Sequence, residues 1–204
     1  MTGWRDKKFL ISVGVSFLFL IAAIVISFFA ITYATESASS PVTDIILSNI
    51  PVFDVDGIFV YGPMFFWVLI VGYLIFFEPK KIPFALKSIA LFIIIRSVFI
   101  ILTHIGPFPT RLQIDASGIF GILFSSGNDF FFSGHTGLPF LMALVFWDNK
   151  CLRNLCIAVS IFFGAIVLMA HLHYSIDVLA AFFITYTIFH VAQKIFKRDW
   201  QLSV

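Results

Sequence analysis

Long apolar runs are the feature of this sequence that most restricts its fold. A helix needs about 20 residues to cross a bilayer, and six runs reach that length, near 9–34, 58–77, 84–105, 130–147, 152–170 and 176–196. They use most of the 204 residues, so we predict an all-α bundle of six transmembrane helices in one integral membrane domain, residues 1–204. A chain that is 60% hydrophobic and 12% charged is not a soluble globular protein.

The N-terminal run begins after a short basic segment. Its length of about 26 apolar residues exceeds the 7–15 residues of a signal-peptide core, so we expect a retained membrane anchor. The two cysteines, Cys151 and Cys156, flank the fifth run at its expected cytoplasmic end, where a disulfide is not favoured.

Basic residues predict the orientation, because lysine and arginine in short loops stay on the cytoplasmic side. Eleven of the 13 basic residues lie at the two ends of the chain and in the 78–87 and 148–153 connections. We therefore expect both termini in the cytoplasm and segments 35–57, 106–129 and 171–175 on the exoplasmic face. Four of the five histidines lie at outer helix ends, a concentration typical of acid–base or nucleophilic chemistry: His104, His135, His171 and His173.

The first chemical motif is "AHLHYSIDVLAAFF", residues 170–183. His173 and Asp177 are four residues apart, so on a helix they share one face and the carboxylate can hold one ring nitrogen. An ionisable pair this close to hydrocarbon indicates a functional site. The alternative is a histidine fixed by an aspartate for topology alone.

The second motif is "NDFFFSGHTGLPF", residues 128–140. Pro139 fits the first turn of a helix, with Thr136 as its N-cap, so Ser133, Gly134 and His135 would form a turn before a helix N-terminus. Such a terminus binds phosphate through its backbone N–H groups and partial positive charge. The motif therefore predicts a phosphate site with a proton donor attached, or else a polar cap with an incidental histidine.

Arg96 lies about 13 residues into its span, or about 20 Å into a roughly 30 Å hydrocarbon core. A guanidinium in the outer half of a membrane needs an anionic partner. Candidates are Asp129, Asp177 and a lipid phosphate, and a structural ion pair is the alternative to a catalytic role.

These residues resemble the signatures of the sphingomyelin synthase family, over roughly residues 50–200. "NDFFFSGHT" resembles its third signature, an Asp followed by Ser-Gly-His-Thr, and "AHLHYSIDV" resembles its fourth, His-Tyr-Ser/Thr-any-Asp-Val. "RSVFIILTHIGPFP" (96–109) is similar to a shortened second signature, and "IPVFDVD" (50–56) to the first. That family has six spans with cytoplasmic ends and belongs to the type 2 phosphatidic acid phosphatase superfamily.

The resemblance implies a phosphotransferase that moves a phosphocholine- or phosphoethanolamine-type head group from a glycerophospholipid to a lipid alcohol, ceramide or diacylglycerol. His173 would be the nucleophile, Asp177 would orient it, and His135 would protonate the departing alkoxide. A phosphohistidine intermediate is implied, without metal or cofactor. The residues expected to bind the phosphate or head group are Arg96, Asp129, Ser133, Gly134, Thr136 and Tyr174.

The chain departs from the phosphatases of that superfamily in two places. They carry Pro before Ser-Gly-His and a Ser-Arg pair six to seven residues before the nucleophile, where this chain has Phe132, Ile166 and Val167. Loss of the clamping arginine favours a phosphodiester donor, which carries one charge less than a monoester. A further departure from the synthase pattern is Gly127-Asn128 in place of Cys-Gly.

Three other functions are open. Water could resolve the same phosphohistidine, giving a lipid phosphatase or a phospholipase C-type hydrolase. A proton-coupled transporter would also bury Arg, Asp and His, but no internal symmetry is visible. A metal hydrolase would use His135, His171 and His173. Nothing suggests nucleic acid as a partner, the expected partners being membrane lipids, and a homo-oligomer is left open.

Overall fold

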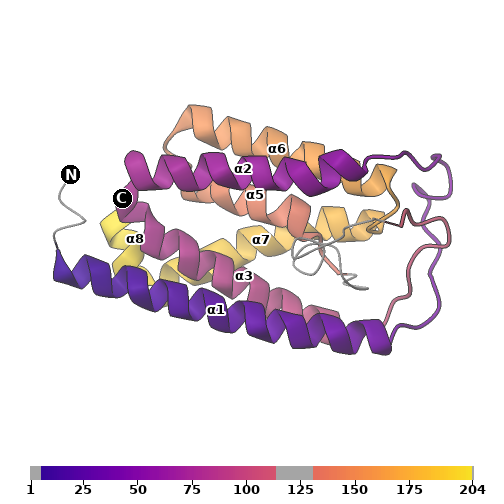
Figure 1. Ribbon diagram of the computed structural model, residues 1–204, viewed down its shortest axis with the longest axis horizontal. Coiled ribbons are helices and arrows are strands. Elements are labelled where there is room, and N and C mark those ends of the chain that lie inside the picture. Colours follow the sequence, from indigo (N-terminus) through magenta and orange to yellow (C-terminus); the bar gives the residue numbers. More distant parts are fainter. Residues whose placement is uncertain (1–5, 114–130, 204) are drawn as a thin grey trace.

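A computed structural model describes residues 6–113 and 131–203, and these ranges form a bundle of helices without a strand (Figure 1). Five of the helical segments in these ranges are long and apolar enough to cross a membrane, as expected of an integral membrane protein. The elements are α1 (Lys7–Glu36), α2 (Asp56–Phe76), the short 3₁₀ helix η1 (Pro79–Lys81), α3 (Ile82–Leu102), α5 (Gly134–Val145), α6 (Lys150–Met169), α7 (Ser175–Ile195) and α8 (Lys197–Ser203).

The helix predicted over 130–147 is shorter than expected, so six membrane spans are not confirmed. Helix α5 has 12 residues, about 18 Å of helix against a hydrocarbon core of about 30 Å. Phe131 and Phe132 have φ of 156° and 24°, and Ser133 is extended, with ψ of 124°. Helical geometry therefore cannot begin before Gly134.

The predicted start of this helix was also wrong, because the helix begins three residues earlier than expected. Ser133, not Thr136, is the N-cap residue, and Gly134 and His135 belong to the first turn instead of a turn before it. Pro139 is the sixth residue of α5 and lies inside the helix. Because proline has no N–H, residue 139 cannot donate the backbone hydrogen bond of an ordinary helical turn.

Helix α1 lies along α3 (Figure 1) and contacts it through small residues. Ser16, Ala23 and Ala30 recur every seven residues and are buried, and the Ser16 hydroxyl reaches the carbonyl of Pro83 at 3.2 Å. Small residues allow this close approach of helices in a membrane. Large apolar side chains such as Leu18 and Phe29 are exposed on α1, as expected where a helix faces lipid.

Helix α5 is held between α3, α6 and α7 at close range. A Cβ on Gly137 would come within 2.6 Å of the Phe92 ring of α3 and 2.8 Å of the Thr185 hydroxyl of α7. A Cβ on Gly164 of α6 would lie 3.3 Å from the Thr136 hydroxyl. These glycines let the backbones approach, so the start of α5 has a fixed position among its three neighbours.

The start of α1 and helix α8 lie at one end of the bundle, opposite the ends that carry the two motifs (Figure 1). Lys87 of α3 pairs with Asp199 of α8, and the Ser12 hydroxyl donates to the same carboxylate at 2.6 Å. These contacts secure α8 against α1 and α3. The direction in which the bundle crosses the membrane, with cytoplasmic termini and an exoplasmic site, stays a prediction.

The long connections meet at the motif end. The N–H of Ser39 donates to the carbonyl of His104 at 2.8 Å, and the N–H of Gly106 to the carbonyl of Ser40 at 3.2 Å. The N–H of Phe53 reaches the carbonyl of Met169, at the end of α6, at 2.9 Å. The segment between α1 and α2 is therefore bound to the segment after α3 and to the turn between α6 and α7.

Candidate active site

His173 lies in the turn between α6 and α7. Helix α6 ends at Met169, and His171 adopts a left-handed conformation with φ of 54°, which reverses the chain. Helix α7 begins at Ser175, so His173 lies before the helix, not on it as the four-residue spacing implied. Asp177 is the third residue of α7, a position from which a side chain reaches back over the preceding turn.

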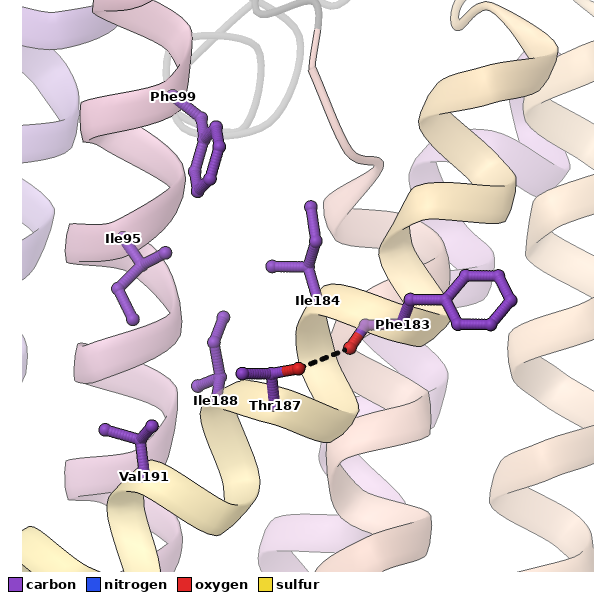
Figure 2. Close-up of a pocket in the computed structure, with 7 residues that line it drawn as sticks. All are labelled: Ile95, Phe99, Phe183, Ile184, Thr187, Ile188 and Val191. Atoms are coloured by element: carbon purple, nitrogen blue, oxygen red, sulfur yellow. Dashed lines mark hydrogen bonds between the residues drawn. The ribbon is translucent and has the colours of Figure 1, made fainter.

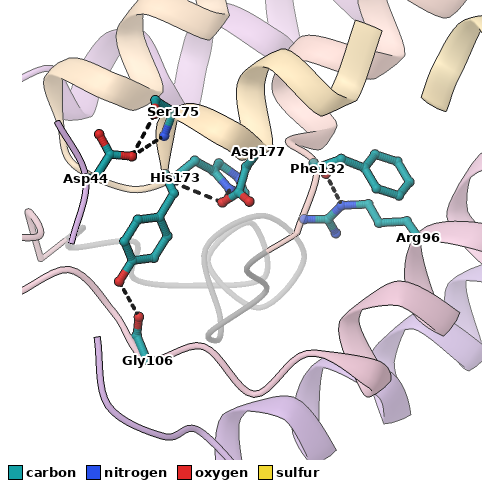
Figure 3. Close-up of polar contacts among 8 residues, drawn as sticks. Asp44, Arg96, Gly106, Phe132, His173, Ser175 and Asp177 are labelled. Carbon is teal, nitrogen blue, oxygen red and sulfur yellow. Dashed lines mark hydrogen bonds and ion pairs between the residues drawn. The ribbon is translucent and has the colours of Figure 1, made fainter. Parts of the chain in front are cut away.

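The predicted pair of His173 and Asp177 is present (Figure 3). Nδ1 of His173 lies 3.3 Å from Oδ2 of Asp177, and that oxygen also accepts the N–H of Tyr174 at 3.0 Å. Both side chains are buried, with exposures of 5% and 0%. When Nδ1 carries the proton and donates it to the carboxylate, Nε2 keeps its lone pair for attack on an electrophile.

The two motifs meet through a backbone hydrogen bond. The N–H of Ser133, the N-cap of α5, donates to the carbonyl of Asp177 at 3.1 Å. The N–H groups of the first turn of α5, from Gly134 onward, have no acceptor within the helix. A helix N-terminus suited to an anion is thereby fixed beside the His173–Asp177 pair.

Three buried oxygens in the first turns of α5 and α7 or at the N-cap of α5 have no hydrogen-bond partner among the described residues. They are Oγ of Ser133, Oγ1 of Thr136 and Oδ1 of Asp177. Buried polar atoms are rarely left unsatisfied in folded proteins. Their grouping at the starts of α5 and α7 is consistent with a site that a polar ligand or water completes.

Arg96 of α3 approaches the same junction from the other side (Figure 3). Its side chain is 9% exposed, and its Nε donates to the carbonyl of Phe132 at 3.0 Å. A Cβ built on Gly134 would lie 3.8 Å from that nitrogen. The guanidinium therefore lies against the first residue of α5, where its charge adds to that of the helix N-terminus.

His135 is the second residue of α5, and its ring is held by aromatic neighbours. The ring stacks on Phe59 of α2 at 4.2 Å between centroids and meets the edge of Phe163 of α6 at 6.4 Å. These contacts restrict the rotation of the imidazole. Its segment lies beside that of His173, because Ser133 and Asp177 are hydrogen-bonded.

Tyr174, which was predicted to bind the head group, is buried and hydrogen-bonded to other segments of the chain. Its side chain is 1% exposed, and its hydroxyl donates to the carbonyl of Gly106 at 2.8 Å and accepts the N–H of Val42 at 3.2 Å. The hydroxyl thus joins the turn before α7 to the segment before α2 and to the segment after α3. Asp129, also predicted to bind phosphate, lies outside the described residues.

Asp44 is a residue of the site region that the sequence reasoning missed. One carboxylate oxygen accepts the N–H and the hydroxyl of Ser175, at 2.7 and 2.8 Å, at the first turn of α7. The other accepts the N–H groups of Ile46 and Leu47, at 2.8 and 3.0 Å. Burial raises the pKa of the Asp44 carboxyl, but these N–H groups outweigh burial and lower it below its usual value of 3.8.

The position of Asp44 fixes the turn that carries His173. Its negative charge lies at the positive end of the α7 dipole. The residue that it binds there, Ser175, follows His173 by two positions. The bonds from Ile46 and Leu47 form an Asx turn, a local motif that many aspartates make. The bond to Ser175 spans 131 residues, so no local pattern could indicate it.

His171 is a structural residue in this arrangement. Its Nδ1 lies 2.6 Å from the Thr110 hydroxyl, and the ring meets the edge of Phe108. Burial lowers its pKa below the ordinary 6.5, although the Ile50 backbone and the charge of Asp44 oppose this. Within residues 6–113 and 131–203 no three His, Cys, Asp or Glu side chains are placed to bind a metal ion, so the metal-hydrolase alternative gains no support.

Comparison with known families covers the region of both motifs. Residues 126–194 match a family described as PAP2 superfamily C-terminal, and this range includes α5, α6 and nearly all of α7. No curated protein and no solved structure gives a significant match to the chain. The family match does not separate phosphatases from phosphotransferases. It supports an integral membrane enzyme of the type 2 phosphatidic acid phosphatase superfamily.

Proposed function

We propose that this protein is a lipid phosphotransferase of the sphingomyelin synthase type. It would move a phospho-head group from a glycerophospholipid to a lipid alcohol, ceramide or diacylglycerol. The observation that carries the proposal is the hydrogen bond from Ser133 to Asp177. It joins the N-terminus of α5, which could bind an anion, to the segment of the His173–Asp177 pair, in which Nε2 of His173 would be the attacking atom.

In the first half-reaction, Nε2 of His173 attacks the phosphorus of the donor. A P–N bond forms while the P–O bond to the diacylglycerol oxygen breaks, and His135 gives its proton to that oxygen. The head group then remains on His173 as a phosphohistidine. Asp177 stabilises the positive charge that develops on the ring through its bond to Nδ1.

In the second half-reaction, the hydroxyl of the acceptor lipid attacks the phosphohistidine. Neutral His135 takes the hydroxyl proton, the P–N bond breaks, and both histidines return to their starting states. A water molecule in place of the lipid alcohol gives hydrolysis by the same steps. The two activities therefore differ in which hydroxyl reaches the phosphorus.

Charge on the phosphoryl oxygens would be stabilised by Arg96 and by the N–H groups of the first turn of α5. Such preorganised donors stabilise the transition state of phosphoryl transfer. Ile166 and Val167, where the superfamily phosphatases carry their clamping pair, are buried in an apolar cluster with Val55 and Phe59. A phosphodiester, with one charge less than a monoester, suits a site without a cation at these positions.

The test uses the purified protein in mixed micelles of a natural lipid extract with labelled ceramide or diacylglycerol. A new labelled phospholipid, identified by mass, is the result expected of a transferase. The head group of this product identifies the class of donor phospholipid. Release of a phospho-head group into water without a new lipid would assign the hydrolase function instead. His173→Ala is the matched negative control for either outcome.

A further inference from the structure

A groove of about 280 Å³ runs between α3 and α7 on the side of the bundle (Figure 2). Ile95 and Phe99 line it from α3, and five residues between Phe183 and Val191 line it from α7. The two helices are close near Val191 and separate toward Phe99 (Figure 2). Of the lining residues, Phe99 lies toward the end of the bundle that holds the candidate site, because its ring contacts Phe131 and Phe132.

The chemistry of the groove is that of hydrocarbon. Among the described residues that line it, Thr187 has the one polar side chain, and its hydroxyl donates to the carbonyl of Phe183 at 3.0 Å, within its own helix. Phe183 is 75% exposed, so the groove opens sideways to the surroundings of α7. In a bilayer those surroundings are the acyl chains of lipids.

The groove borders the phosphate side of the candidate site at Phe99. The Phe99 ring stacks on Phe131 at 5.2 Å and meets the edge of Phe132 at 5.9 Å, and Ser133 follows directly. Arg96, one turn before Phe99 on α3, bonds to the carbonyl of Phe132. A ligand whose phosphate lay at the start of α5 would therefore have the apolar lining of α3 and α7 next to it.

We infer that this groove holds an acyl chain of the donor phospholipid, an inference that rests on the proposed function. The lining from Phe183 to Val191 covers about 12 Å of helix, close to the roughly 15 Å of hydrocarbon in one leaflet. Because lipid tails are as apolar as the groove, binding there gains little from the hydrophobic effect. The groove acts by orientation, since it aligns the phosphorus with His173.

Filling the groove tests this role through the length of the donor chain. Thr187→Trp and Val191→Trp place an indole in the groove at exposed positions, and Leu179→Trp is the control at an exposed position of α7 outside it. With long-chain donors, kcat/KM should fall about tenfold or more in the two groove variants, because a misplaced phosphorus reacts slowly. With dihexanoyl donors, whose chains do not reach Thr187, all variants should match the wild type.

Photolabelling gives a readout that does not depend on turnover. A phospholipid with a diazirine near the end of one acyl chain should label the α3 and α7 peptides of wild type and of the Leu179→Trp variant, and label Thr187→Trp weakly. Equal labelling of the lipid-facing side of α6 would identify ordinary bilayer lipid and overturn the inference.

Turnover and labelling separate the two hypotheses. A wild-type protein that turns over phospholipid, while the groove variants show no dependence on donor chain length, would refute the groove and leave the function standing. Dependence on the acceptor chain instead of the donor chain would also refute it. Groove labelling that a phosphodiester donor competes for, without any turnover, would retain the binding site and contradict the proposed enzyme.

Discussion

Substitution of Asp44 by alanine should destabilise the protein through the turn that carries His173. The carboxylate bridges the connection between α1 and α2 and the first turn of α7, with four hydrogen bonds. Alanine leaves the N–H and hydroxyl of Ser175 without their acceptor. It also removes a negative charge from the positive end of the α7 dipole.

The size of the effect follows from these contacts. Loss of a helix cap costs about 1 kcal/mol, loss of the charge at the helix terminus about 0.3–1 kcal/mol, and loss of the local bonds to Ile46 and Leu47 about 0.5–1.5 kcal/mol together. The free energy of unfolding should therefore fall by about 2–3 kcal/mol, since these effects act at one site and are not fully additive. For a chain of this size that corresponds to a Tm lower by about 5–10 °C.

Thermal unfolding of the purified proteins in one detergent measures this difference. Asp54→Ala is the matched control, because Asp54 is exposed on the same connection and its carboxylate accepts a local N–H, that of Asp56, at 3.3 Å. Asp54→Ala should change Tm by less than about 2 °C. If Asp44→Ala unfolds at the same temperature as Asp54→Ala, the proposed role of the Asp44 bridge is wrong.

The same bridge predicts a dependence on pH. The pKa of Asp44 in the folded protein is lower than the unfolded value of 3.8. The stabilisation by its carboxylate is therefore complete above that unfolded value and disappears as the pH falls through the lower folded pKa. The difference in Tm between wild type and Asp44→Ala should be constant from neutral pH to about pH 5 and shrink below pH 4.

Three further substitutions test other parts of the account. Arg96→Lys should lower kcat/KM about tenfold or more with unchanged expression, because a point charge replaces a planar fork; an equal loss of folded protein would show a structural role. Gly137→Ala should cost about 1–3 kcal/mol, because its Cβ would overlap the Phe92 ring, whereas Gly72→Ala, which meets open space, should be neutral in thermal unfolding. The pKa of His171 in the folded protein is below 6.5. As the pH falls, the unfolded chain therefore binds this proton first, and the free energy of unfolding should decline below about pH 6.5. His171→Gln should weaken that decline, and an unchanged dependence of Tm on pH would contradict the prediction.

The sequence predicted the pairing of His173 with Asp177 better than it predicted the backbone that brings them together. The pairing of His173 with Asp177 followed from their spacing, although the structure achieves it with His173 in a turn and Asp177 reaching back from the third position of α7. Arg96 was expected to have an anionic partner, Asp129, Asp177 or a lipid phosphate; it lies against the start of α5 and donates to the carbonyl of Phe132, and the anionic partner stays a prediction. Such predictions succeed because charged groups in an apolar chain are few and each needs a partner.

The predictions that failed depended on backbone conformation or on distant contacts. Proline at 139 suggested a helix that begins near Thr136, but a proline inside a helix is tolerated when neighbouring helices hold it. The left-handed Phe131 and Phe132 set the true start, and nothing in a run of phenylalanines indicates that conformation. Tyr174 was predicted to bind the head group, and its contact with Gly106 could not be foreseen because the two residues are 68 apart in the sequence.

The most direct test of the proposed mechanism is to trap and locate the phosphorylated residue. The purified protein is mixed with a phospholipid labelled with ³²P at its phosphate, without acceptor lipid, then quenched in alkali and digested. We predict alkali-stable, acid-labile label on the peptide that contains His173, and no label in the His173→Ala variant. Label on a different residue, or label that persists in His173→Ala, would contradict the assignment of His173 as the nucleophile.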